Sequence, residues 1–303
     1  MRDDFEASFQ EQLQAIEAET LDGPVDLERL PAALSERSLP APYCFAYPAP
    51  VQGADDPASI LREQVWEPES RQRAAALMVR YSQPGALREQ MLGGADDATL
   101  AACARILAVL VCAEESAINV FEHECGRLQR EQVQANERAL REIETEERVH
   151  NWLIQQARAH LPAPEDLDAI RRRTRRLFMR VASRDIAEHF ARLTGLDSGV
   201  CISLSALLGS AKVRRLSGFA ELLTHIRHDE ATHVRKSREH AVGLGFDATR
   251  FHECYDLTRT GMVEMLRPIS SSFETLEVDP ERLFKRLLRF QDKRSVSSAE
   301  VVD

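Results

Sequence analysis

The sequence contains no run of about 18 consecutive apolar residues, the length that a membrane-spanning helix needs. Its first ten residues, MRDDFEASFQ, are charged where a signal peptide has an apolar centre. We therefore expect a cytoplasmic protein without a membrane partner.

Aromatic residues make up only 6% of the chain, and no segment alternates apolar and polar residues over the length of a strand. Ala, Leu, Arg and Glu are abundant instead, and these residues favour helices. The composition thus predicts an all-α protein, and 303 residues are enough to bury a full core.

The sequence also lacks closely spaced pairs of cysteines. The six cysteines include no Cys-x-x-Cys motif, and Cys103, Cys112 and Cys125 fall within apolar helical patterns. Buried, reduced thiols are therefore expected rather than disulfides or a zinc site.

The chain has too little positive charge for a general nucleic-acid-binding protein. Its formal net charge is −10 and its pI is about 5.5, so a phosphate backbone would be repelled. The one basic run, Arg171-Arg172-Arg173-Thr174-Arg175-Arg176, is interpreted as a solvated helix face or one paired with nearby acids.

The pattern of prolines and apolar residues divides the chain into three parts. Residues 1–58 are expected to form an N-terminal helix and a Pro-rich arm, 59–290 a helical domain, and 291–303 a disordered tail. Helices are predicted at 59–81, 97–133, 137–160, 164–196, 211–243, 246–267 and 280–290. Residues 199–209, GVCISLSALLG, are expected to form a buried helical turn or a bend.

Two acid-Glu-x-x-His motifs on separate predicted helices carry the functional signal. Residues three apart lie on the same side of a helix, so each motif projects one carboxylate and one imidazole into the same volume. One such motif is common by chance, whereas two form a specific signal for a pair of metal half-sites. The motifs are Glu146-Glu147-x-x-His150 and Asp229-Glu230-x-x-His233.

A two-metal site between four helices needs one more carboxylate from each of two other helices. Glu114, 33 residues before Glu147, is our choice on the first helix, with the adjacent Glu115 kept open. On the third helix we assign Glu188, which has apolar neighbours and lies 42 residues before Glu230. The longer spacing is explained if residues 199–209 add a bend.

Carboxylates suit such a site because they are hard anionic donors that can bridge two ions, and imidazole completes each ion. Four carboxylates also neutralise two divalent ions. His225 and His228 are placed off the ligand face, because the position one turn before Glu230 is Ile226.

These motifs resemble the ferritin-like di-iron carboxylate superfamily, which includes bacterioferritin, rubrerythrin, the ribonucleotide reductase small subunit and several oxygenases. The neighbourhood of Glu114 is similar to the first ligand helix of bacterioferritins, and HIRHDEATH to the last ligand helix of the reductase and the oxygenases. The resemblance implies a ferritin-like four-helix bundle over 97–243 with extra N- and C-terminal helices. It also implies that Glu146 and Asp229 each accept a hydrogen bond from the opposite histidine.

Departures from the superfamily patterns narrow the function. Residues 97–243 contain no tyrosine, which disfavours a tyrosyl radical store; a rubrerythrin-type Cys-x-x-Cys centre is absent, and the chain is much larger than a ferritin cage subunit. We therefore expect a non-haem, O2-dependent oxygenase with two Fe ions, or Mn/Fe, that hydroxylates, N-oxygenates or oxidatively cleaves a small organic substrate. The expected pocket residues are Phe121, Phe190, Leu223 and Ile226.

The sequence carries no flavin or nicotinamide motif, so electrons are expected from a separate donor or from the substrate itself. A homodimer is compatible with the sequence. Two alternatives stay open: a ferroxidase, iron-storage or metal-binding protein of the same superfamily, and a helical interaction protein whose acids and histidines form salt bridges without metal.

Overall fold

The computed structural model describes residues 60–61, 68–81, 93–131, 137–159 and 161–288. The described part is all-α and contains no strand, as the composition predicted. The Pro-rich arm at 1–58 and the tail at 291–303 lie outside the described residues. The α-helices are α4 (Pro68–Tyr81), α6 (Asp97–Glu131), α7 (Glu137–Arg158), α8 (Leu167–Val181), α9 (Ile186–Gly209), α10 (Ala211–Arg215), α11 (Ser217–Gly243), α12 (Phe251–Leu266), α13 (Ser270–Thr275) and α14 (Pro280–Leu288).

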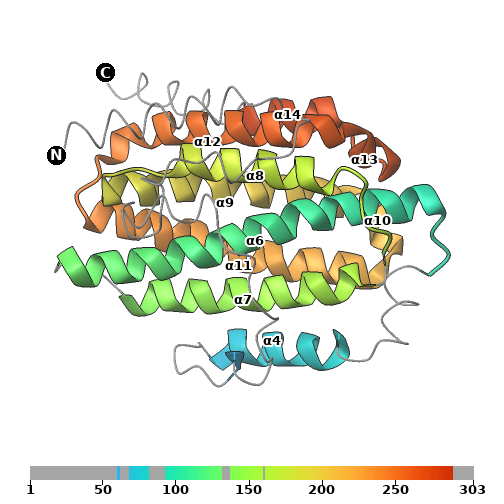
Figure 1. Cartoon of the computed structure of the whole chain (residues 1–303), viewed down its shortest axis with the longest axis horizontal. Coiled ribbons are helices and arrows are strands. Elements are labelled where there is room, and N and C mark those ends of the chain that lie inside the picture. Colours follow the sequence, from blue (N-terminus) through green and yellow to red (C-terminus); the bar gives the residue numbers. More distant parts are fainter. Residues whose placement is uncertain (1–59, 62–67, 82–92, 132–136, 160, 289–303) are drawn as a thin grey trace, which may run out of the picture.

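Four long helices form the centre of the molecule (Figure 1). Helix α6 packs along α7, α9 packs along α11, and α7 also contacts α11. Helices α8 and α12 contact one another, and they lie against α6 and α9 respectively. Helix α4 packs on α7, at the opposite edge of the molecule from α12 and α14 (Figure 1).

Helix α6 begins where the sequence provides a capping residue. The side chain of Asp96 accepts a hydrogen bond from the Thr99 amide at 2.7 Å, which satisfies one of the amides without a partner in the first helical turn. The apolar stripe that follows, including Leu107 and Val111, is buried against the neighbouring helices. Helices α6 and α7 match the predicted ranges 97–133 and 137–160 within two residues at each end.

The single helix predicted over 164–196 is wrong, because the structure has two helices there. Helix α8 ends at Val181, and Asp185 caps α9 by accepting a hydrogen bond from the Glu188 amide at 3.0 Å. The Ser183 hydroxyl supports this turn by accepting a hydrogen bond from the Asp185 amide. Local side-chain capping therefore outweighs the continuous helical pattern.

Residues 199–209 are not a separate turn or bend but the second half of α9. A break occurs farther along, where α10 ends and Leu216 precedes α11, inside the range predicted as one helix over 211–243. Among the described residues, α9 alone is long and apolar enough to cross a membrane by length and composition. Of its most apolar window, 56% is buried inside the protein, as a central helix of a packed domain would be.

Two glycines of α9 allow α12 to approach closely. A Cβ atom at Gly195 would overlap the Thr258 side chain and lie 3.2 Å from the Tyr255 Cα atom. A Cβ atom at Gly199 would overlap the Met262 side chain. Close contact between these helices keeps the middle of α9 at the centre of the molecule, between α11 and α12.

Candidate metal centre

Buried acids and histidines from α6, α7 and α11 converge between the central helices. Glu114, Glu147, His150 and Glu230 each offer an atom, and these atoms all lie within 4.8 Å of one another. Their exposed fractions are between 0% and 5%, and His233 is also fully buried. The structure thus contains a buried Glu/His cluster that could hold a metal ion.

Glu147 lies between the two imidazoles. His150 Nδ1 is 3.5 Å from one oxygen of Glu147 and 3.5 Å from Glu114 Oε2. His233 Nδ1 is 3.2 Å from the other oxygen of Glu147 and 3.9 Å from Glu230 Oε2. Both histidines therefore present Nδ1 to the carboxylates.

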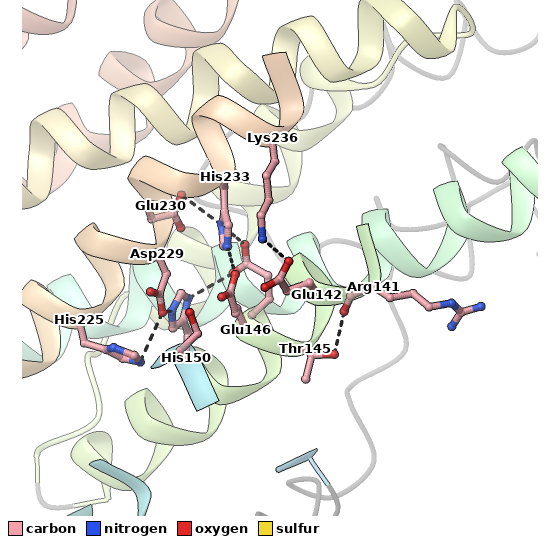
Figure 2. A network of polar contacts seen from close by, with 12 residues as sticks. Arg141, Glu142, Thr145, Glu146, His150, His225, Asp229, Glu230, His233 and Lys236 are labelled. Carbon is pink, nitrogen blue, oxygen red and sulfur yellow. Dashed lines mark hydrogen bonds and ion pairs between the residues drawn. The ribbon is translucent and has the colours of Figure 1, made fainter. Parts of the chain in front are cut away.

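The other ring nitrogens contact acids across the bundle (Figure 2). His150 Nε2 lies 3.1 Å from Asp229 Oδ2, and His233 Nε2 lies 2.9 Å from Glu146 Oε2. A carboxylate can only accept a hydrogen bond, so each contact places an imidazole proton on Nε2. When the ring is neutral, this leaves the Nδ1 lone pair facing the cluster.

The structure does not bring Glu188 to this cluster. It is the third residue of α9, its side chain is 29% exposed, and it pairs with Arg192 at 3.0 Å and with the Ser183 hydroxyl at 3.0 Å. These contacts give it a local role at the start of the helix, so the assignment to the centre is corrected.

Asp197 occupies the place on α9 that was assigned to Glu188. It is 9% exposed and lines the same cavity as Glu114, Glu147 and Glu230. It lies 33 residues before Glu230, the spacing that also separates Glu114 from Glu147. This equal spacing is the signal that would have identified Asp197 from the sequence.

Of the two adjacent acids on α6, Glu114 faces the cluster and Glu115 does not. Glu115 is half-buried, and its charge interacts with Arg171, Arg158 and Arg175. The apolar stripe alone could not decide which of the two acids faces the cluster, and the structure shows that it is Glu114.

The carboxylates oppose one another's ionisation because they are buried and close together. Burial and the charge of Glu147 raise the pKa of Glu114, and burial together with Glu147 and Asp197 raises the pKa of Glu230. Burial raises the pKa of Asp197 to about 8. For Glu147, contacts with Glu114, His150 and His233 outweigh burial and lower the pKa.

Both histidines favour the protonated form in this environment. Burial alone would lower the pKa of His150, but Glu114 and Asp229 outweigh it and raise the pKa. Likewise, contacts of His233 with Glu146 and Glu147 outweigh burial and raise its pKa. The pKa values of three of the four carboxyl groups and of both histidines are raised, so the cluster has an excess of negative charge when its acids ionise, and cations would neutralise it.

Asp229 has further neighbours outside the cluster. His225 Nε2 lies 3.5 Å from Asp229 Oδ2, and the Arg73 guanidinium of α4 donates a hydrogen bond to Asp229 Oδ1 at 3.3 Å. His150, His225 and Asp229 form a second group with metal-binding geometry. His225 is therefore buried beside the acid that orients His150, whereas His228 is exposed.

A cavity of ≈ 70 Å³ opens beside the carboxylates. Apart from Glu114, Glu147, Asp197, Glu230 and Ser203, its lining is apolar and comes from α6, α8, α9, α12 and α13. The predicted pocket residues do not line it: Phe121, Phe190, Leu223 and Ile226 are buried elsewhere in the core.

The donor set fits a pair of metal ions. Glu114, Glu147, His150, Asp197, Glu230 and His233 each have a buried side-chain atom with no hydrogen-bond partner. Leaving a buried polar atom unsatisfied costs about 1–3 kcal/mol, and a bound metal ion would satisfy these six atoms. Four carboxylates and two imidazoles are the ligands of a two-metal carboxylate site.

Comparisons with protein-family models, with curated proteins and with solved structures found no match for this chain. The assignment of a function therefore depends on the site itself.

Proposed function

We propose that α6, α7, α9 and α11 form a ferritin-like four-helix bundle that holds two iron ions. Glu114, Glu147 and His150 form one half of the ligand set. Asp197, Glu230 and His233 form the other half. The observation that carries this proposal is the unsatisfied buried atom on each of these six side chains.

We further propose that the protein is a non-haem, O2-dependent oxygenase of a small organic substrate. Two iron ions in such a site supply the reducing electrons and the binding position for dioxygen. Mn/Fe suits the same donors. The cavity beside the carboxylates supports oxygenase function over iron storage, because storage has no need for an apolar cavity at the metal centre.

The chain's own residues have distinct parts in this proposal. Glu146 and Asp229 hold a proton on Nε2 of the opposite histidine, so that Nδ1 stays available as a ligand. The apolar cavity walls exclude bulk water and hold the substrate beside the carboxylates. Electrons for turnover would come from a separate donor or from the substrate.

Anaerobic iron loading followed by exposure to oxygen tests this function. About two Fe(II) per chain are expected, from the donor count of a two-metal carboxylate site. Oxygen should then produce an optical transient whose decay accelerates with an accepted substrate. Oxidation that ignores every substrate and continues beyond two irons per chain would favour storage, and a folded protein that binds no metal would refute both.

A further inference from the structure

The cavity beside the carboxylates follows the helix axes. On α6 its lining runs from Glu114 through Leu110 to Ile106, and on α9 from Asp197 through Val200 to Leu207. At about 1.5 Å per residue, the distance from Glu114 to Ile106 along α6 is about 12 Å. The cavity therefore extends away from the carboxylates over roughly two helical turns.

The cavity is also narrow. One water molecule needs about 10–15 Å³ of such space. The cavity volume of ≈ 70 Å³ therefore corresponds to about five to seven water molecules. Because this volume is spread over two helical turns, the cavity is about as wide as a single hydrocarbon chain. An elongated ligand fits it better than a ring system.

Among the residues that the structure describes, the walls away from the carboxylates offer no hydrogen-bond donor to a ligand. Of the described residues there, Ser203 alone has a polar side chain, and its hydroxyl donates to the Gly199 carbonyl at 3.0 Å. Phe273 and Leu207 line the cavity as well. A polar group on the ligand inside this part would lose its hydrogen bonds to water without replacement.

Methionines from α12 add flexibility to the wall. Met262 and Met265 line the cavity, and unbranched thioether side chains adapt to ligands of slightly different shape. A wall of this kind accommodates chains of several lengths.

We propose that the cavity binds a linear alkyl or acyl chain, with the reacting end of the substrate at the carboxylates. This proposal names the substrate class of the oxygenase proposed above, and it rests on that function. It places the unreactive end of the chain between Ile106 and Leu207, at the far end of the cavity from the carboxylates.

The test is calorimetric titration of the full chain with linear 1-alkanols of increasing length, as purified and after anaerobic iron loading. One binding site is expected, with affinity rising about fourfold per methylene until the cavity is filled. A negative heat-capacity change should accompany binding, because apolar surface is buried. Aniline serves as the ring-shaped comparison.

Variants at the far end of the cavity test whether the alkanols bind inside it. Ile106→Phe should lower the chain length at which the gain in affinity stops, and Leu207→Ala should raise it. Leu107→Phe is the matched control, since Leu107 is buried on the same helix but does not line the cavity. Each variant is compared by melting temperature without ligand, so that unfolding is separated from loss of binding.

The outcomes distinguish this inference from the function on which it rests. If iron binds but alkanols do not, or if aniline binds more tightly and the far-end variants change nothing, the alkyl-chain inference is overturned. If alkanols bind with the expected length dependence while no iron binds, the proposed oxygenase function fails and the chain-binding cavity stands.

Discussion

His233 Nε2 lies 2.9 Å from Glu146 Oε2, and this contact joins an imidazole of α11 to a carboxylate of α7. His150 and Asp229 make the reciprocal contact, from α7 to α11, at 3.1 Å. Each Glu-x-x-His motif thus carries the acid that orients the histidine of the other motif. Neither proposed half-site has its geometry without the opposite helix.

Glu146→Ala should weaken metal binding by about 10- to 100-fold, because the His233 ring loses the acceptor that fixes its orientation. The measurement is competition with a chelator of known affinity. Glu144→Ala is the control on the same helix, since the Glu144 carboxylate pairs with Arg148 instead. Equal affinities in the two variants would contradict the orienting role.

Asp197→Asn should reduce bound iron from about two to about one per chain, because an amide is a much weaker ligand than a carboxylate. Metal analysis of the loaded protein measures the ratio. Glu188→Gln should leave the iron content unchanged, since Glu188 pairs with Arg192 and Ser183 at the start of α9. The opposite result would return Glu188 to the ligand set.

The metal-free protein should lose stability as pH rises from about 4 to about 8. The pKa of Asp197 is raised from 3.8 to about 8, so the folded chain holds a proton in this range that the unfolded chain releases. The raised pKa values of Glu114 and Glu230 act in the same direction, as does the loss of protonated His150 and His233. Urea unfolding with chelator present measures the trend.

The lowered pKa values of His225 and His240, both about 4 because of burial, oppose this trend up to about pH 6.5, because the unfolded chain binds protons there that these two rings do not hold in the folded chain. The lowered pKa values of Glu147 and Asp229 affect stability only below about pH 4.5. We expect the groups with raised pKa values to determine the net pH dependence of stability, because they outnumber the groups that oppose them. Metal binding should instead strengthen with pH up to about 8 and release protons. Calorimetry in buffers of different ionisation enthalpy counts these protons, and a pH-independent affinity would contradict the assignment.

Gly195→Ala should destabilise the protein by about 1–3 kcal/mol, because an added methyl group must push α12 away from α9. The new Cβ atom would meet backbone at Tyr255 as well as the Thr258 side chain. Gly209→Ala is the control, since a Cβ atom there has nothing within 4 Å. Thermal unfolding compares the two, and equal stability would show that the helices can separate freely.

The all-α class and the motifs on α7 and α11 could be predicted from sequence because they depend on short-range spacing. A Glu-x-x-His pair on one helix is on one face wherever that helix packs. Asp197 was missed for a different reason. The helical pattern continues through residues 182–185 and so predicts Glu188 in a helix interior. The capping interactions of Ser183 and Asp185 instead place Glu188 at a helix start.

The pocket could not be predicted in the same way. The sequence shows only which apolar residues neighbour the predicted ligands along their own helices, and these are Phe121, Phe190, Leu223 and Ile226. The cavity instead lies where α8 and α12 meet α6 and α9, and contacts between helices distant in sequence leave no local pattern. Leu177 and Met262, for example, line the cavity from helices that carry no predicted ligand.

The two proposed half-sites are unequal, because one has an aspartate, Asp197, where the other has a glutamate, Glu114. The side chain of Asp197 is one methylene shorter, so its oxygens reach less far from the backbone of α9 and have fewer ways to swing between ions. We therefore expect one ion to be held more loosely and to exchange first, so that the pair would load and empty in a fixed order.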